Sequence, residues 1–281
     1  MMTVGSVHDD TAPLMTPPTT PADGQARPHR PDPPGALGSA VRQLRWDWLQ
    51  QMRNPSAIFF TLALPVLFLL AFAITSPDTE AAAGYYVPTM MGLAAASGTL
   101  TNLAVTLTYL REYGQLKRIL VTPLPRSSFL AGRIAAAGIV SLLTCAVLGV
   151  VGAAAYDVMP EQLWALLLAL VVIVTAGSAV GVLTTTIIRS ETAAAPVANA
   201  IGLPVMLASG VFFPLSNAPD WFTRVAELLP FTRSVELAVA SYEGTVTGEL
   251  VQQALLTGGL WTLGAIVLAV RFFSWAPRKR R

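Results

Sequence analysis

The chain has 281 residues, of which 53% are hydrophobic and 12% are charged, and its formal net charge is +2. Soluble globular domains carry about 25% charged residues, so this composition excludes an ordinary soluble domain. It predicts an all-α integral membrane protein whose helices are surrounded mainly by lipid.

The N-terminal segment, residues 1–35, differs from the rest of the chain. It is rich in proline, carries charges of both signs and contains no aromatic residue. Such a segment buries too little apolar surface to offset the entropy of ordering it. We expect a disordered cytoplasmic tail, with a proline-rich docking tail as the alternative.

Residues 36–54 have the pattern of an amphipathic helix that lies in the headgroup layer. Two tryptophans, Trp46 and Trp48, stand among arginines, which suits a membrane interface. Pro55 then ends this helix and turns the chain into the bilayer. The apolar residues at helical spacing are Leu37, Val41, Leu44, Trp48 and Met52.

Six apolar stretches follow, each near the length of about 20 residues that a bilayer core requires. All of the 18 basic residues except Arg224 and Arg233 lie in segments that then share one side. The positive-inside rule therefore puts both termini, including a basic tail at 273–281, in the cytoplasm. The predicted spans are 57–75, 85–108, 128–155, 162–187, 195–214 and 250–270.

The connection between the second and third spans predicts a short cytosolic helix over residues 109–121. Pro123 stops it, because proline cannot continue a helix and restricts the residue before it. The alternative is a solvated loop that only anchors orientation. One face would carry Tyr109, Tyr113, Leu116 and Leu120, and the other Arg111, Glu112, Gln115 and Arg118.

The last external connection, residues 215–249, predicts two short amphipathic helices. Apolar residues from Trp221 to Leu229 have helical spacing, Pro230 ends that helix, and a second helix fits Arg233 to Tyr242. They form either a re-entrant hairpin in the outer leaflet or helices on the membrane surface, and the pattern leaves both open.

Polar residues inside the spans are few and uncharged. They are interpreted as interhelical hydrogen bonds or as contacts along a substrate pathway. Asn199 is the stronger pathway candidate, because it lies between Pro196 and Pro204, where a bent helix frees backbone groups. The residues concerned are Thr101, Asn102, Thr184 to Thr186 and Asn199.

The chain lacks the usual catalytic and metal-binding residue types within its spans. Both histidines, His8 and His29, lie in the N-terminal tail, and the only cysteine is Cys145. Neither lysine, Lys117 or Lys279, stands in the Gly-Lys-Ser/Thr sequence of a phosphate-binding loop. We therefore expect no enzyme and no metal site, and any ATP that drives the protein must bind elsewhere.

The order of residues in the 109–121 segment resembles that of the ABC-2 family of exporter permeases. The matching residues run Arg111-Glu112, Gly114, Lys117-Arg118-Ile119-Leu120 and Thr122-Pro123-Leu124. Ser209 to Leu215, followed by Leu229 to Thr232, also resembles the segment after the fifth span of that family. The nearest subgroup is the daunorubicin-type drug-resistance permeases of actinobacteria.

The resemblance implies that residues 55–272 form a six-span permease domain in a bacterial plasma membrane. The 109–121 segment would be the coupling helix of a separate ATPase that holds ATP and Mg²⁺, and a re-entrant 215–249 hairpin is favoured. Two permease copies would export an apolar or amphipathic drug, antibiotic or lipid-like molecule from the cytoplasm or inner leaflet. No nucleic-acid partner is expected. The implied coupling residues are Arg111, Glu112, Gly114, Gln115, Lys117, Arg118, Thr122 and Pro123, with Asn102 and Asn199 on the pathway.

Two other functions remain open on the sequence. One is an integral membrane enzyme, against which the missing catalytic groups count. The other is a non-transporting scaffold or sensor subunit that uses the same cytosolic helix to dock a partner.

Overall fold

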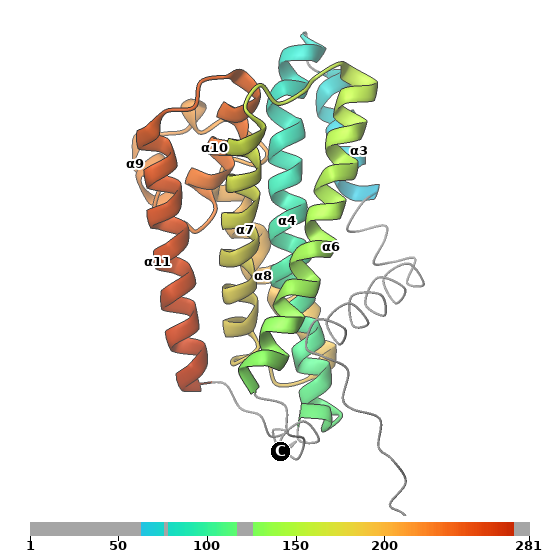
Figure 1. Ribbon diagram of the computed structural model, residues 1–281, viewed down its shortest axis with the longest axis vertical. Helices are drawn as coiled ribbons and strands as arrows, with labels where there is room; N and C mark the ends of the chain where they lie inside the picture. The colour runs from blue at the N-terminus through green and yellow to red at the C-terminus, as the bar shows by residue number, and fades with distance from the viewer. Residues whose placement is uncertain (1–62, 76–77, 117–125, 273–281) are drawn as a thin grey trace, which may run out of the picture. The chain divides into compact units, whose positions relative to one another are not determined.

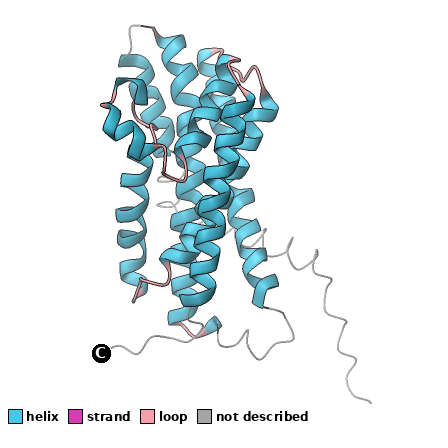
Figure 2. Cartoon of the chain, turned by 90° about the vertical axis from the view of Figure 1, so that its left-hand side faces the viewer, coloured by secondary structure: helices cyan, strands magenta, loops and turns pink. Residues whose placement is uncertain are grey.

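A computed structural model describes residues 63–75, 78–116 and 126–272, which all belong to one compact unit. Throughout these residues the regular elements are helices (Figures 1 and 2), which confirms the all-α prediction for the described part of the chain. Three predicted segments lie outside the described residues: the tail 1–35, the interfacial helix 36–54 and the basic tail 273–281. The helices are α3 (Leu64–Thr75), α4 (Thr79–Glu112), α6 (Arg126–Tyr156), α7 (Leu163–Thr184), α8 (Glu191–Ala208), α9 (Asp220–Ala226), α10 (Thr232–Glu243) and α11 (Gly248–Phe272).

Helix α4 is the centre of the bundle. It packs against α3, α6, α7, α8 and α10, while α11 packs against α7 and α10. Small residues allow the close approach of α4 and α7: a Cβ added to Gly181 would lie 2.6 Å from the carbonyl oxygen of Leu100. Close backbone packing of this kind is how helices associate in lipid, where no hydrophobic driving force brings them together.

Five of the described helices are long and apolar enough to cross a membrane, and they correspond to the predicted second to sixth spans. Only twelve residues of the predicted first span, in α3, are described as helix. The chain is therefore a multi-pass membrane protein. The five helical stretches are Thr79–Glu112, Phe129–Tyr156, Leu163–Thr184, Glu191–Ala208 and Gly248–Phe272.

The ends of the helices differ from the predictions in ways that matter for function. Helix α4 begins at Thr79, where the Asp78 carboxylate accepts a hydrogen bond from the Ala81 N–H at 3.0 Å, and it runs on to Glu112. The predicted 109–121 helix therefore does not begin at Tyr109, because residues 109–112 are the last turn of α4. Helix α7 ends at Thr184, three residues before the predicted end of its span.

The 215–249 connection contains the two predicted short helices, α9 and α10, after a 3₁₀ turn at Leu215–Asn217. Helix α10 packs into the bundle against α4, α7 and α11. Phe231, just before α10, is fully buried and shares a small cavity with Leu93 and Leu100 of α4. Residues 93–100 lie near the middle of α4, so α10 begins at about half the depth of the bundle.

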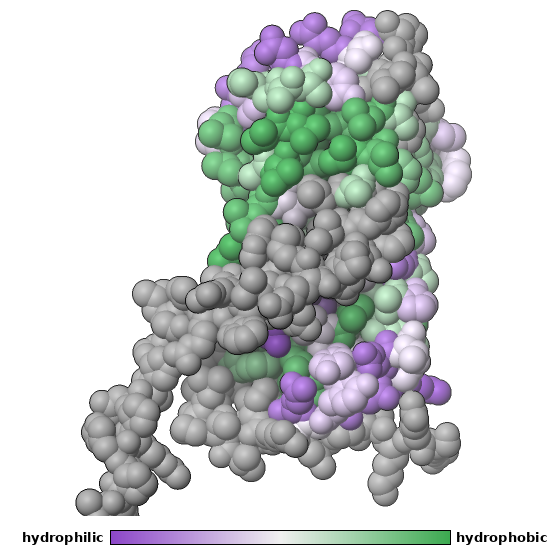
Figure 3. Space-filling view, turned by 90° about the vertical axis from the view of Figure 1, so that its right-hand side faces the viewer, coloured by the Kyte–Doolittle hydropathy of each residue, from purple (hydrophilic) through white to green (hydrophobic). Residues whose placement is uncertain are grey.

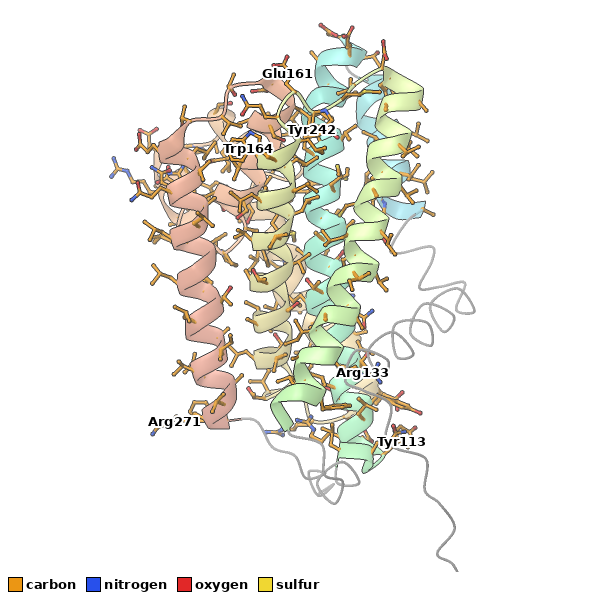
Figure 4. The ribbon with its side chains drawn as sticks, in the orientation of Figure 1. Tyr113, Arg133, Glu161, Trp164, Tyr242 and Arg271 are labelled. Carbon is orange, nitrogen blue, oxygen red and sulfur yellow. The ribbon has the colours of Figure 1, made fainter. Side chains whose placement is uncertain are left out.

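The two ends of the bundle carry opposite charge. Every described acidic residue except Glu112 and Glu191 lies at or toward the end that holds α9, α10 and the α6–α7 connection, which we call the acidic end. Arg111, Arg133, Arg189 and Arg271 lie at the opposite, basic end, and Figure 4 shows Arg133 and Arg271 far from Glu161. On the face in Figure 3, hydrophobic surface lies between polar regions at the two ends.

Candidate functional site

The end of α4 is joined to the turn between α7 and α8 by a buried arginine. Arg111 is only 2% exposed, its Nη1 donates to the Thr185 carbonyl at 2.8 Å, and its Nη2 donates to the Ile188 carbonyl at 2.6 Å. Carbonyls at the C-terminal end of a helix lack partners within that helix and carry partial negative charge. Arg111 therefore caps the end of α7 from a neighbouring helix.

The next residue, Glu112, binds the start of α8. Its Oε2 accepts a hydrogen bond of 2.5 Å from the backbone N–H of Glu191, the first residue of α8. Ser190, which precedes it, makes no side-chain cap bond of its own. A carboxylate at a helix N-terminus satisfies a free N–H and meets the positive end of the helix dipole. Glu112 thus supplies a cap that α8 does not make for itself.

A third contact comes from Tyr113, the residue at the C-terminal cap of α4 (Figure 4). Hydrogen bonding to the Glu191 carboxylate and the negative charge of that carboxylate raise the pKa of Tyr113 above its ordinary value. Its ring also packs at a tilt of 39° against that of Tyr109, with ring centroids 4.5 Å apart. Arg111, Glu112 and Tyr113 together form what we call the clamp, which holds the turn from Thr185 to Glu191.

The clamp corrects the predicted sidedness of the 109–121 segment. Arg111 and Glu112 do not form a free polar face, because they point at the backbone of the α7–α8 turn. Tyr109 and Tyr113, predicted on the apolar face, are 38% and 59% exposed. The orientation follows from α4 itself. Its last turn continues the register set by the bundle, and the backbone groups at the end of α7 and the start of α8 attract the two charges.

The other predicted coupling residues fall into two groups. Gly114 has a φ of +69°, a conformation that favours glycine and that ends α4 directly after the clamp. Gln115 is exposed and Leu116 is fully buried. The remaining four, Lys117, Arg118, Thr122 and Pro123, lie outside the described residues.

The two predicted pathway residues have different surroundings. The Thr101 hydroxyl of α4 donates to Oδ1 of Asn199 on α8 at 3.2 Å, and the Asn199 side chain is otherwise exposed on the outside of the helix. Asn102 instead accepts from Thr106, one turn away in the same helix, at 3.1 Å. Only Asn199 therefore links two spans through its side chain.

Sequence reasoning placed the connection between these two spans at residues 188–194, whereas α7 already ends at Thr184. It therefore put Thr184 to Thr186 inside a span as donors to other helices. Thr184 and Thr185 instead donate to the carbonyls of Val180 and Val182 in their own helix. The signal that was present is Ser190 followed by Glu191, a pair typical of a helix start. It marks a chain turn at the basic end, close to Arg111 and Glu112.

Comparison with known proteins identifies the family of the chain. The family described as ABC-2 type transporter matches residues 43–242, which include the clamp and most of α10. The chain is also 27% identical over 231 residues to the "probable doxorubicin resistance ABC transporter permease protein DrrC" of two Mycobacterium tuberculosis strains, CDC 1551 / Oshkosh and ATCC 25618 / H37Rv. Each alignment covers 77% of this chain and 79% of the relative. The chain therefore belongs to the ABC-2 type transporter family.

Proposed function

We propose that this chain is the transmembrane permease subunit of an ATP-driven exporter, and that the clamp transmits motion from its ATPase to the pathway. The clamp is the observation that carries the proposal. It ties the end of α4, which leads into the predicted coupling residues, to the first N–H of α8. A displacement of the α4 end would therefore displace α8, the helix that carries Asn199.

The energy source is expected on a separate subunit. The chain has no Gly-Lys-Ser/Thr sequence, so ATP and Mg²⁺ would bind an ABC ATPase that docks on the predicted coupling residues beyond the clamp. Membership of the ABC-2 family supports such a partner. The clamp itself lies within this chain and would pass on the motion without touching the nucleotide.

The membrane topology is proposed to have six spans with the basic end in the cytoplasm of a bacterium. The positive-inside rule supports this orientation, because arginines collect at the end where the clamp lies. Helix α10 would then be re-entrant from the outside. The burial of Phe231 beside the middle of α4 supports this, since backbone at that depth is tolerated only against protein or water.

Two copies of the chain are proposed to enclose the pathway. Helix α8 exposes Asn199 together with Leu203 and Leu207, which are 54% and 48% exposed. An amide on a lipid-facing surface is unfavourable, so Asn199 is better explained by a second copy or by a pathway between copies. The substrate would be an apolar or amphipathic drug, antibiotic or lipid-like molecule. Similarity to drug-resistance permeases supports a drug as the substrate.

Reconstitution tests the proposal. The full chain and a co-expressed ABC ATPase are placed in inside-out vesicles with doxorubicin as the probe. We expect accumulation of the drug that requires ATP and both chains, and co-purification of the two chains. ATP hydrolysis by the chain alone at an enzymatic rate, about 1–10³ per second, would contradict the proposal that a separate subunit hydrolyses ATP. So would accumulation that needs no ATPase.

A further inference from the structure

A cavity of about 210 Å³ lies toward the acidic end of the bundle, between the start of α4, the end of α8 and α10. It is separate from the clamp, which lies at the opposite end. Tyr85 of α4 borders it and donates a hydrogen bond to the Gly210 carbonyl, which joins α4 to the residue pair after α8. The cavity is partly open to solvent. Its volume is large enough for one ring-sized group, since a cavity of about 150 Å³ can bind benzene.

One part of the cavity wall is apolar. Pro214 and Leu215 contribute from the segment after α8, and Val235 and Val239 contribute from one face of α10. These side chains would cover the body of a small organic molecule. They provide no ligand for a hydrated ion, which needs several oxygen atoms around it.

The polar part of the wall is negative. Glu236 and Glu243 are seven residues apart on α10, which puts both carboxylates on the same face of that helix, and both border the cavity. Glu236 is paired with Arg233 at 2.8 Å, whereas no described basic side chain pairs with Glu243. The residues that line the cavity include no lysine, arginine or histidine.

Helix α8 adds to this potential. Its C-terminal end, at Ser209 and Gly210, borders the same cavity, and the C-terminal end of a helix carries partial negative charge. A carboxylate face, a helix end and an apolar wall therefore meet at one cavity. A divalent metal fits poorly, since within the described residues no group of three or more acidic, cysteine or histidine side chains can hold one.

We infer that this cavity binds organic cations that combine a protonated or quaternary amine with a ring-sized apolar body. The inference rests on the proposed export function, for which it names the substrate class at the release side. Asn199 lies ten residues before Ser209 on α8, about 15 Å along the helix axis. A cation that leaves the proposed pathway would then meet the cavity at the end of the same helix.

The test uses two probes of the same shape, phenyltrimethylammonium and its neutral isostere tert-butylbenzene. Ligand-observed NMR measures their binding to the full chain in nanodiscs, with empty nanodiscs as the lipid blank. We expect the cation to bind more tightly than the neutral probe. Glu243→Gln should weaken cation binding at least about fivefold, or about 1 kcal/mol, and leave the neutral probe unchanged.

A matched control is Glu249→Gln, whose carboxylate lies at the same end of the bundle but accepts from Gln253 on α11 and does not border the cavity. It should leave cation binding unchanged. Val239→Trp fills the cavity and should abolish binding of the cation, with elution of the purified variant as the check on folding.

Three results would overturn the inference: equal binding of both probes, wild-type cation binding by Glu243→Gln, or a signal no greater than that of empty nanodiscs. The assay needs neither ATP nor an ATPase. A failure here with intact ATP-dependent export would remove only the cation site. Normal cation binding without ATP-dependent export would remove the proposed function and leave the site.

Discussion

At the residue scale, the clamp places two charged side chains of α4 on backbone groups near the end of α7 and at the start of α8. Arg111 donates to the Thr185 carbonyl at the C-terminal cap of α7 and to the Ile188 carbonyl in the turn that follows, and Glu112 provides an acceptor to the first N–H of α8. Each charge is placed where the helix dipole favours it. Because Arg111 is 2% exposed, its two bonds are also shielded from competing water.

Arg111→Met tests this at the level of stability. The change keeps an apolar stem of similar length and leaves the Thr185 and Ile188 carbonyls unpaired. Bonds to charged groups contribute about 1.5–3 kcal/mol each, so we expect the melting temperature in detergent to fall clearly. The melting temperature of Arg111→Lys should lie between those of the wild type and Arg111→Met, because an ammonium lacks the planar fork that reaches two carbonyls. An unchanged melting temperature for Arg111→Met would mean that the cap contributes nothing.

The sequence identified Arg111 and Glu112 but not what they bind. Their partners are backbone atoms more than seventy residues further on. Every residue carries a backbone carbonyl and nearly every residue a backbone N–H, so the residue pattern does not indicate which of them Arg111 and Glu112 bind. Asn199 was easier to find, because an amide in an apolar span stands out, and its contact with Thr101 is the interhelical bond that the sequence suggested as one alternative.

At the element scale, helix existence was easier to predict than helix ends. The second to sixth spans were all found, because about 20 apolar residues are a strong signal. The boundary at Tyr109 was wrong, because α4 continues through polar residues that the α7–α8 turn stabilises. The two short helices between α8 and α11 were predicted, but the burial of α10 depends on packing that periodicity cannot show.

The close contact between α4 and α7 gives an element-scale prediction. Gly181→Ala would bring a Cβ to 2.6 Å from the Leu100 carbonyl oxygen, so the two helices must separate. Overpacking of this kind destabilises by about 1–3 kcal/mol, and the melting temperature should fall. Gly259→Ala on α11 is the matched control, because nothing lies within 4 Å of its added Cβ. Equal melting temperatures for the two variants would contradict close packing at Gly181.

At the scale of the whole molecule, the two proposed functional regions lie at ends of the bundle that carry opposite charge. The clamp lies at the basic end and the proposed cation cavity lies toward the acidic end, with α8 running between them. If the basic end faces the cytoplasm, the coupling input is inside and the release side is outside. The sequence predicted this orientation from the arginines, whereas it did not indicate that Glu236 and Glu243 would share a cavity with the end of α8.

Single cysteines test the orientation in intact cells, in a Cys145→Ala background. Asp157 and Asp220 are exposed at the acidic end, so cysteines there should react with an impermeant thiol reagent. A cysteine at Gln115, exposed beside the clamp, should react only after the cells are opened. Labelling of position 115 in intact cells would reverse the proposed topology.

The most direct test of the account is the coupling ratio of Glu112 variants, measured as doxorubicin exported per ATP hydrolysed in vesicles that contain the full chain and its ATPase. Glu112→Ala removes the acceptor at the start of α8, so we predict near-normal membrane level and ATP hydrolysis with export reduced about tenfold, which corresponds to about 1.4 kcal/mol. Glu112→Gln, which keeps an acceptor oxygen, should recover part of the export. Glu249→Ala removes a carboxylate at the opposite end of the bundle, outside the clamp and the predicted coupling residues, and should behave as wild type. A wild-type coupling ratio for Glu112→Ala would show that the clamp does not transmit the motion.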